Sequence, residues 1–246
     1  MWEWKFVKRK YLKQILILVI SSFLIGCTSN GANKVQKQNN TFNVSNSKIV
    51  NAGLDLKVGN LNINSSNSNN ISSKITFSKP EWKPNIENTK HSNSEDINIS
   101  QPNMGNINKS NNDINKWNLS FSENVPTNMT IKTKACDVTA DLRKVQLNKL
   151  DIDMGTGKLS LDISGNYKTN LNVNLNCGVG ETTIYFPENI GVKVKIKKHF
   201  IAKVIDSTWF TNNGDEYTNS NYGKTNVTIY ATVNANVGKI NLKTSK

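Results

Sequence analysis

The chain has 246 residues, of which 36% are hydrophobic, and a formal net charge of +13 that comes almost wholly from lysine. This length allows one large or two small domains, with enough apolar residues for a thin core. About one residue in six is asparagine, which is a poor helix former and tolerates left-handed turns, so the composition favours β structure. The scarcity of arginine disfavours a nucleic-acid-binding protein.

The first 26 residues are similar to a bacterial lipoprotein signal peptide. A basic segment precedes the apolar run ILILVISSFLIG, which is too short to span a bilayer comfortably but suits a signal-peptide core. The run ends in Leu24-Ile25-Gly26-Cys27, which resembles the lipobox, where signal peptidase cleaves before a lipid-modified cysteine. We expect a lipid on Cys27 that anchors the protein to the extracytoplasmic face of the cell membrane. An uncleaved anchor with an incidental cysteine is the alternative.

Residues 27–48 form a polar segment without a periodic pattern. About 20 flexible residues span on the order of 25 Å. We therefore predict that this segment is a flexible tether that holds a folded domain just off the membrane.

Residues 49–125 are predicted to form a first β domain. Apolar residues alternate at Leu54, Leu56 and Val58, and after Gly59 the alternation resumes with the opposite parity. A period of two indicates a strand with one buried face, and glycine supplies the backbone angles that a corner between two such strands needs. Further strands are expected at 71–77, 96–101 and 117–121.

Residues 126–246 repeat this pattern, with corners at Cys136, Gly157 and Gly180 that are 21 and 23 residues apart and a last copy with its corner at Gly238. Repeats of this size cannot bury their own apolar face, so they predict an all-β fold in which strand coils stack into a β-solenoid. A twisted β-sandwich built from similar hairpins is the alternative.

The order of several segments resembles the bacterial toast-rack proteins. These segments are LDLKVGNLNI, PEWKP, INISQ, WNLSF, VPTNMTIK, LDIDMGTGKLSLDIS, LNCGVGETTIYFPENIGVKVKI and VNANVGKINL. The resemblance implies a toast-rack-like domain over 49–125 and, over 126–246, a β-solenoid domain similar to the C-terminal part of LiaF-like, cell-wall-active-antibiotics-response proteins. Related domains carry the description "putative adhesin". The chain departs from the family at Cys136, where glycine is usual.

LiaF-like proteins restrain an envelope-stress signalling kinase and carry transmembrane helices before this domain. In this chain a lipobox takes their place. The resemblance therefore implies an extracytoplasmic module without assigned activity, and an envelope signalling protein is one possible partner.

No catalytic constellation stands out, so we expect no enzyme and no cofactor. A nucleophile-elbow serine and a phosphate-binding loop are both missing. His91 and His199 are far apart and no zinc-ligand spacing exists, so no metal site is expected. Several aspartates fall on outward strand positions, where a solvated polar face is favoured over a calcium site: Asp137, Asp141, Asp151, Asp153 and Asp162.

Cys136 and Cys177 are the cysteines that follow Cys27. The repeat alignment places them two coils apart, which is beyond disulfide reach because neighbouring strands are about 4.8 Å apart. Two separate thiols are therefore favoured over a disulfide.

A lysine cluster is the sharpest surface feature of the sequence. Its members are Lys193, Lys195, Lys197, Lys198 and Lys203. Alternation places the first three on the exposed face of one strand, where they could attract anionic cell-wall polymer or lipid headgroups. The alternative is a charged face that prevents unwanted strand pairing.

These observations predict a non-enzymatic, membrane-anchored lipoprotein whose β-solenoid serves as an interaction or envelope-stress-response module. An electrostatic, adhesin-like binder of anionic polymer or headgroups is the alternative. An enzyme acting on the cell wall is the least favoured reading.

Overall fold

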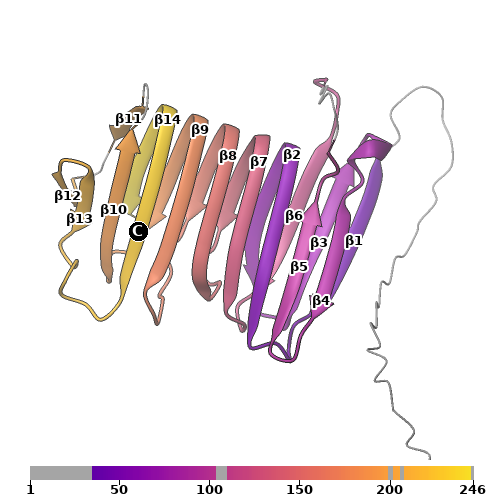
Figure 1. Ribbon diagram of the computed structural model, residues 1–246, viewed down its shortest axis with the longest axis horizontal. Coiled ribbons are helices and arrows are strands. Elements are labelled where there is room, and N and C mark those ends of the chain that lie inside the picture. The colour runs from indigo at the N-terminus through magenta and orange to yellow at the C-terminus, as the bar shows by residue number, and fades with distance from the viewer. Residues whose placement is uncertain (1–34, 104–109, 199–201, 206–207, 245–246) are drawn as a thin grey trace, which may run out of the picture.

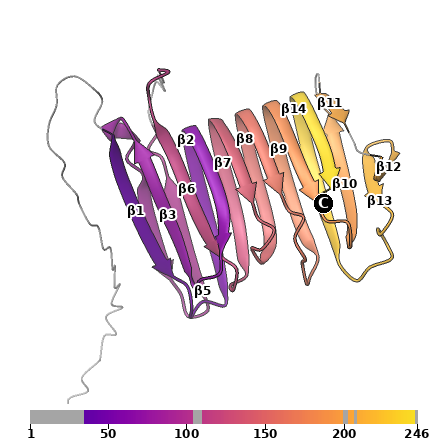
Figure 2. The ribbon, with the colours of Figure 1, turned by 180° about the vertical axis from the view of Figure 1, so that it is seen from behind.

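The computed structural model describes residues 35–103, 110–198, 202–205 and 208–244, and its strands form one 14-stranded sheet (Figures 1 and 2). The prediction of an all-β fold is confirmed. A single 3-10 turn, η1 (Pro80–Trp82), interrupts the strands. The strands are β1 (Gln36–Asn43), β2 (Ile49–Ser66), β3 (Asn70–Phe77), β4 (Asn85–Lys90), β5 (Ser94–Ser100), β6 (Asn115–Ser122), β7 (Thr127–Asp141), β8 (Leu147–Asp162), β9 (Leu171–Phe186), β10 (Gly191–Lys198), β11 (Ala202–Ile205), β12 (Phe210–Asn213), β13 (Glu216–Asn219) and β14 (Thr228–Thr244).

Five long strands, β2, β7, β8, β9 and β14, lie side by side and run parallel. A broken coil flanks this group at each end: β5 and β6 both pair with β2, and β10 and β11 both pair with β14. The antiparallel strands β1, β3 and β4 extend the sheet at one end, and β12 and β13 extend it at the other. The predicted β-solenoid is therefore confirmed.

Each long strand turns at its middle, so that the stack has two outer faces. In β8, Ile152 and Met154 are buried before the corner and Leu159 and Leu161 are buried after it. The parity of buried residues switches at the corner, as predicted, and both halves contribute to one apolar core. We call the outer surface of the segments before the corner the first face, which is nearest the viewer in Figure 1. The outer surface after the corner is the second face.

The corners form a ladder across the stack. Strand register places Gly59 opposite Cys136, and Gly180 opposite both Gly157 and Gly238. All four glycines have a positive φ, from 132° to 145°. Cys136 does not, and its buried Sγ donates a hydrogen bond to the Leu56 carbonyl at 3.3 Å. At this corner, therefore, a buried cysteine side chain occupies the position where the other corners have a glycine without a side chain.

The structure corrects the prediction of a flexible tether over residues 27–48. Residues 1–34, including Cys27, lie outside the described residues, but Gln36–Asn43 form β1, which pairs with β3 along its whole length. The segment lacks an apolar pattern because Gln36, Gln38 and Asn40 take its inner positions, with only Phe42 buried at the end. Backbone hydrogen bonds with β3 form this strand, and they do not require an alternating apolar pattern in the sequence.

The sheet continues across the boundary predicted between residues 125 and 126. β2, from the predicted first domain, pairs with β7, from the second, from Val50–Thr127 to Ile63–Ala140. One core cluster includes residues from both sides of this point. No helix among the described residues is long and apolar enough to cross a membrane.

Candidate functional site

The predicted lysine strand is β10, and Lys193, Lys195 and Lys197 point outward from it. Lys193 Nζ lies 2.9 Å from Glu216 Oε2 on β13 and 5.6 Å from the centre of the Tyr222 ring. The hydrogen bond with Glu216 raises the pKa of Lys193, and the hydrogen bond from Lys193 lowers the pKa of Glu216. One charge of the predicted cluster is therefore neutralised within the protein.

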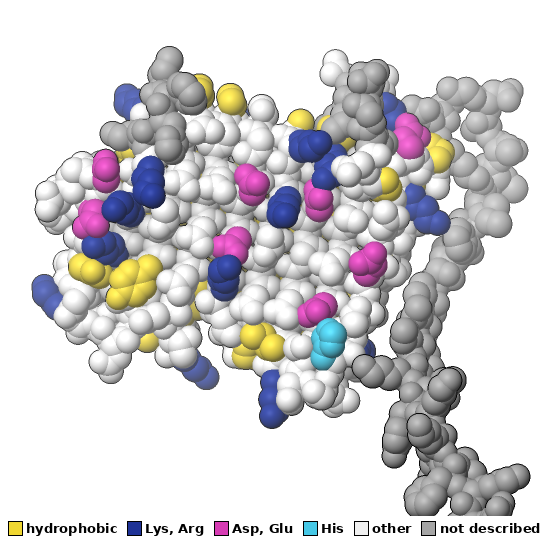
Figure 3. Space-filling model, viewed as in Figure 1, with side chains coloured by type: hydrophobic (Ala, Val, Ile, Leu, Met, Phe, Trp, Pro, Cys, Tyr) yellow, Lys and Arg dark blue, Asp and Glu magenta, His cyan; other side chains and the backbone are white. Residues whose placement is uncertain are grey.

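The other lysines of the cluster do not form one patch. Lys195 and Lys197 are exposed on the first face, whereas Lys203 is exposed on β11, beyond the corner and on the second face. The side chain of Lys198 lies outside the described residues. On the first face, basic side chains gather at the end that carries β10, with acidic ones among them, and charges of both signs are mixed along the rest (Figure 3).

Ladders of asparagine side chains run across the strands of the first face. Asn51 Nδ2 donates to Asp96 at 2.7 Å, and Asn128 Nδ2 donates to Asn51 at 2.9 Å. Further along the stack, Asn234 donates to Asn176 at 2.7 Å. In-register parallel strands place equivalent side chains about 4.8 Å apart, where carboxamides can hydrogen-bond in series. This stacking gives a physical role to the abundant asparagine.

A hollow of about 560 Å³ opens on the first face over β5, β2, β7 and β8. It is centred on Gly53, which register places between Asn98 on β5 and Thr130 on β7. A Cβ atom on Gly53 would lie 2.2 Å from Asn98 Oδ1, so the missing side chain lets the Asn98 carboxamide lean over the glycine backbone. Gly53 thus interrupts the row of outward side chains.

Ion pairs and hydrogen bonds hold the side chains around this hollow. Asp96 accepts hydrogen bonds from Asn51 and His91, which lower its pKa. For Asp151, burial opposes ionisation, but hydrogen bonds from Lys149 and Asn174 outweigh it, so the pKa is lowered. Asp55 pairs with Lys57 at 2.6 Å. Each carboxylate of the lining therefore has a positively charged or titratable partner.

The sequence prediction missed the hollow altogether. The one signal for it was the glycine at an outward position between Ala52 and Leu54, which is far from the corner where glycine was expected. A glycine on the exposed side of a strand often marks a close approach of another group.

Cys136 and Cys177 do not form a disulfide with each other, as predicted. Register places Cys177 opposite Met154 and Ala235, whereas Cys136 lies in the corner row. Burial raises the pKa of Cys177, an effect that the hydrogen bond from Thr182 opposes.

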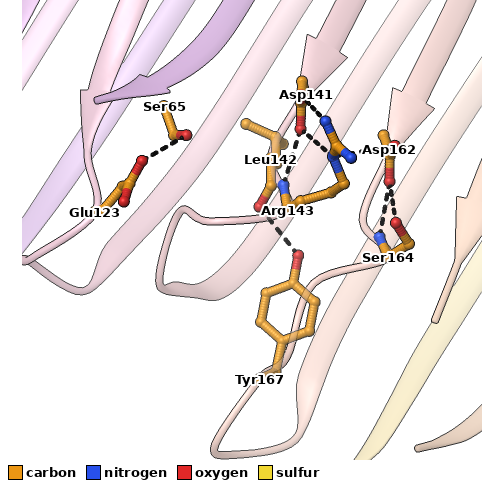
Figure 4. A network of polar contacts seen from close by, with 8 residues as sticks. All are labelled: Ser65, Glu123, Asp141, Leu142, Arg143, Asp162, Ser164 and Tyr167. Carbon is orange, nitrogen blue, oxygen red and sulfur yellow. Dashed lines mark hydrogen bonds and ion pairs between the residues drawn. The ribbon is translucent and has the colours of Figure 1, made fainter. Parts of the chain in front are cut away.

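Four of the five outward aspartates make local polar contacts: Asp137, Asp141, Asp151 and Asp162. At the ends of β7 and β8, Arg143 Nη2 lies 2.7 Å from Asp141 and its Nε lies 3.4 Å from Asp162, while Tyr167 donates to the Leu142 carbonyl (Figure 4). Burial raises the pKa of Tyr167. Among the described residues, no group of three or more metal-ligating side chains comes together. This network ties adjacent turns and has the features of a structural element.

The family model for the N-terminal domain of toast_rack (DUF2154) matches residues 31–185. The match starts before the predicted domain start at 49 and runs past the predicted boundary at 125. No curated protein matches the chain significantly.

Solved structures provide a further comparison. The crystal structure of a "putative cell adhesion protein" from Clostridium sporogenes is 37% identical in sequence, with a TM-score of 0.82, and the alignment covers 86% of this chain and 100% of that one. A "putative adhesin" from Bacteroides fragilis is 12% identical, with a TM-score of 0.29, over 86% of this chain and 98% of that one. At that TM-score the second likeness has no bearing on the function of this chain.

Proposed function

Because the chain belongs to the toast-rack family, we propose that it is a non-enzymatic lipoprotein, anchored through Cys27 to the extracytoplasmic face of the cell membrane. Its β-solenoid acts there as an adhesin-like interaction module. An envelope signalling protein is a partner that the family resemblance makes reasonable.

One observation carries the adhesin-like part of this proposal: the 37% identity, over 86% of the chain, to the Clostridium sporogenes "putative cell adhesion protein". One structural feature agrees with it. The stack presents two long outer faces of aligned polar side chains, which suit contact with an extended partner.

Lipid anchoring is tested by Cys27→Ala in cells fed with labelled palmitate. We expect the wild-type protein to carry label and to sediment with membranes, and the variant to lose both properties. Cys177→Ala is the matched control and should keep both. Label-free wild-type protein, or unchanged sedimentation of processed Cys27→Ala protein, would contradict the anchoring.

The exposure of Lys195 and Lys197 supports a second candidate function, electrostatic binding of anionic cell-wall polymer. Retention on isolated cell walls should then fall with salt, because such contacts are screened over about 10 Å at 0.1 M salt. Lys195→Gln combined with Lys197→Gln should weaken retention, whereas Lys193→Gln should change it little, since Glu216 already neutralises that charge. Retention that is independent of salt would exclude this candidate.

A further inference from the structure

The hollow around Gly53 combines a defined shape with polar groups that the protein does not itself use. It extends over four neighbouring strands, about 14 Å from the first to the fourth, and its floor includes the backbone of Gly53. In other rows of outward side chains on the first face, amide groups hydrogen-bond to one another across the strands. At Gly53 this series is broken.

The break leaves hydrogen-bonding groups on both sides of the glycine available. Among the described residues, the side chains of Asn98, Thr130 and Lys132 make no hydrogen bond or ion pair, although all three line the hollow. The carboxamide of Asn98 and the hydroxyl of Thr130 can each donate and accept a hydrogen bond. They face each other across the backbone of Gly53.

The side chains that surround these three groups are fixed by contacts with one another. On one side Asn51 links Asp96 to Asn128, and on another Lys149 lies 2.6 Å from Asp151. Side chains whose positions are fixed by such contacts lose little further entropy when a ligand binds.

The charge balance of the lining favours one class of ligand. Three carboxylates, those of Asp55, Asp96 and Asp151, and two ammonium groups, those of Lys132 and Lys149, line the hollow. Lys57, which pairs with Asp55, brings the ammonium groups to three, so the hollow has no excess formal charge of either sign that would select a cation or a strongly anionic polymer. A neutral ligand rich in hydroxyl groups suits this surface, because each hydroxyl both donates and accepts hydrogen bonds.

We propose that the hollow around Gly53 binds a neutral saccharide, with Asn98, Thr130 and Lys132 making the direct contacts. This inference rests on the proposed function, because it takes the outer face of the stack as the interacting surface. It deepens that function by naming a class of ligand. The lining contains no aromatic ring, so the sugar is held by hydrogen bonds without stacking. Affinity per site is therefore weak, with a Kd of about 1 mM, and adhesion arises from many anchored copies acting together.

The test uses full-length protein in detergent micelles, with chitotetraose and cellotetraose as probes, observed by saturation-transfer difference NMR. We expect at least one probe to bind the wild-type protein, and Asn98→Ala or Thr130→Val to weaken binding about fivefold each, as expected for loss of one hydrogen bond. Thr232→Val is the matched control, because Thr232 occupies the same outward row on β14 but lies outside the hollow. It should leave binding unchanged.

Circular dichroism establishes that each variant is folded before it is compared. Absence of binding by both probes would overturn the proposal, as would binding that Asn98→Ala and Thr130→Val leave intact. Palmitate labelling of the same preparation reports on the anchoring independently, so failure of saccharide binding and failure of the proposed function remain distinguishable.

Discussion

Gly180 and Gly157 are in closer contact than any side chain would allow. A Cβ atom on Gly180 would lie 1.8 Å from the carbonyl oxygen of Gly157 on the neighbouring strand, and the φ angle of Gly180 is +145°. Gly238 stands in the same relationship to Gly180. The corner thus stacks backbone directly on backbone, and the glycines are a requirement of the coil spacing.

Gly180→Ala should accordingly destabilise the fold severely. The substitution adds a collision with backbone to the cost of an unfavourable φ, so we expect a loss of about 3 kcal/mol or more in the free energy of unfolding. Gly214→Ala separates the two effects, because Gly214 has a φ of +65° but nothing within 4 Å of its Cβ position. That control should lose only about 1 kcal/mol. Equal losses in urea denaturation would show that crowding at the corner is not the cause.

The asparagine ladder makes a prediction about a partly buried side chain. Asn51 donates to Asp96 and accepts from Asn128, so Asn51→Ala should lower the free energy of unfolding by about 1–2 kcal/mol. Asn172 lies in the same outward row on β9 and is exposed. Asn172→Ala should therefore cost less than about 0.5 kcal/mol. Similar values for the two variants in chemical denaturation would contradict a stabilising ladder.

Acid should weaken the fold through Asp113. Its buried carboxylate lies 2.8 Å from Lys79 Nζ, and the hydrogen bond from Lys79 lowers its pKa to about 2. An aspartate in the unfolded chain has a pKa of about 3.9. The unfolded state therefore binds more protons between these values, and the stability that Asp113 contributes is lost as the pH falls from about 4 through 2.

Asp113→Asn should lower the melting temperature at pH 7 but flatten its decline below pH 4. The exposed Asp215 supplies the control, since Asp215→Asn removes a charge without this ion pair. A decline between pH 4 and 2 that is as steep in Asp113→Asn as in the wild-type protein would rule out this role.

The two thiols should differ from a disulfide in a simple labelling experiment. Under denaturing, non-reducing conditions Cys136 and Cys177 should both take up iodoacetamide. In the folded protein both should react slowly at pH 8, since Cys136 is buried and burial raises the pKa of Cys177. The rate at Cys177 should increase as the pH rises above 9, because the thiolate is the nucleophile. Cys136→Ala and Cys177→Ala assign the two signals, and absence of label after denaturation would mean a disulfide.

The local alternation of apolar and polar residues predicted the stacked strands well. The switch of parity around Gly59, Gly157 and Gly180 reflects direct contact of each side chain with the core, and such contact constrains residue type. Even the replacement of glycine by Cys136 in the corner row could be seen from the repeat alignment, and the strand register confirms it.

Features that depend on non-local pairing could not be predicted. β14 inserts between β9 and β10, and nothing in its own residues specifies those neighbours. The pairing of Lys193 with Glu216 and the hollow at Gly53 likewise result from strands that are distant in sequence. β1 was missed for a related reason. Its backbone groups form hydrogen bonds with β3, while its side chains are mostly polar and give no strand pattern.

The strand order also sets the length of the sheet from one end to the other. β1 begins the order and β10 lies eight strands further on, which corresponds to roughly 40 Å at the usual strand spacing. With the proposed lipid on Cys27 and the stack upright, the sheet is a spacer. Its coil number determines how far Lys195 and Lys197 stand from the bilayer, well outside the range of about 10 Å at which they could sense the headgroups of their own membrane. Adding or deleting one coil would then adjust this height by about 5 Å, and the natural target of the far end would be material beyond the membrane that carries the protein.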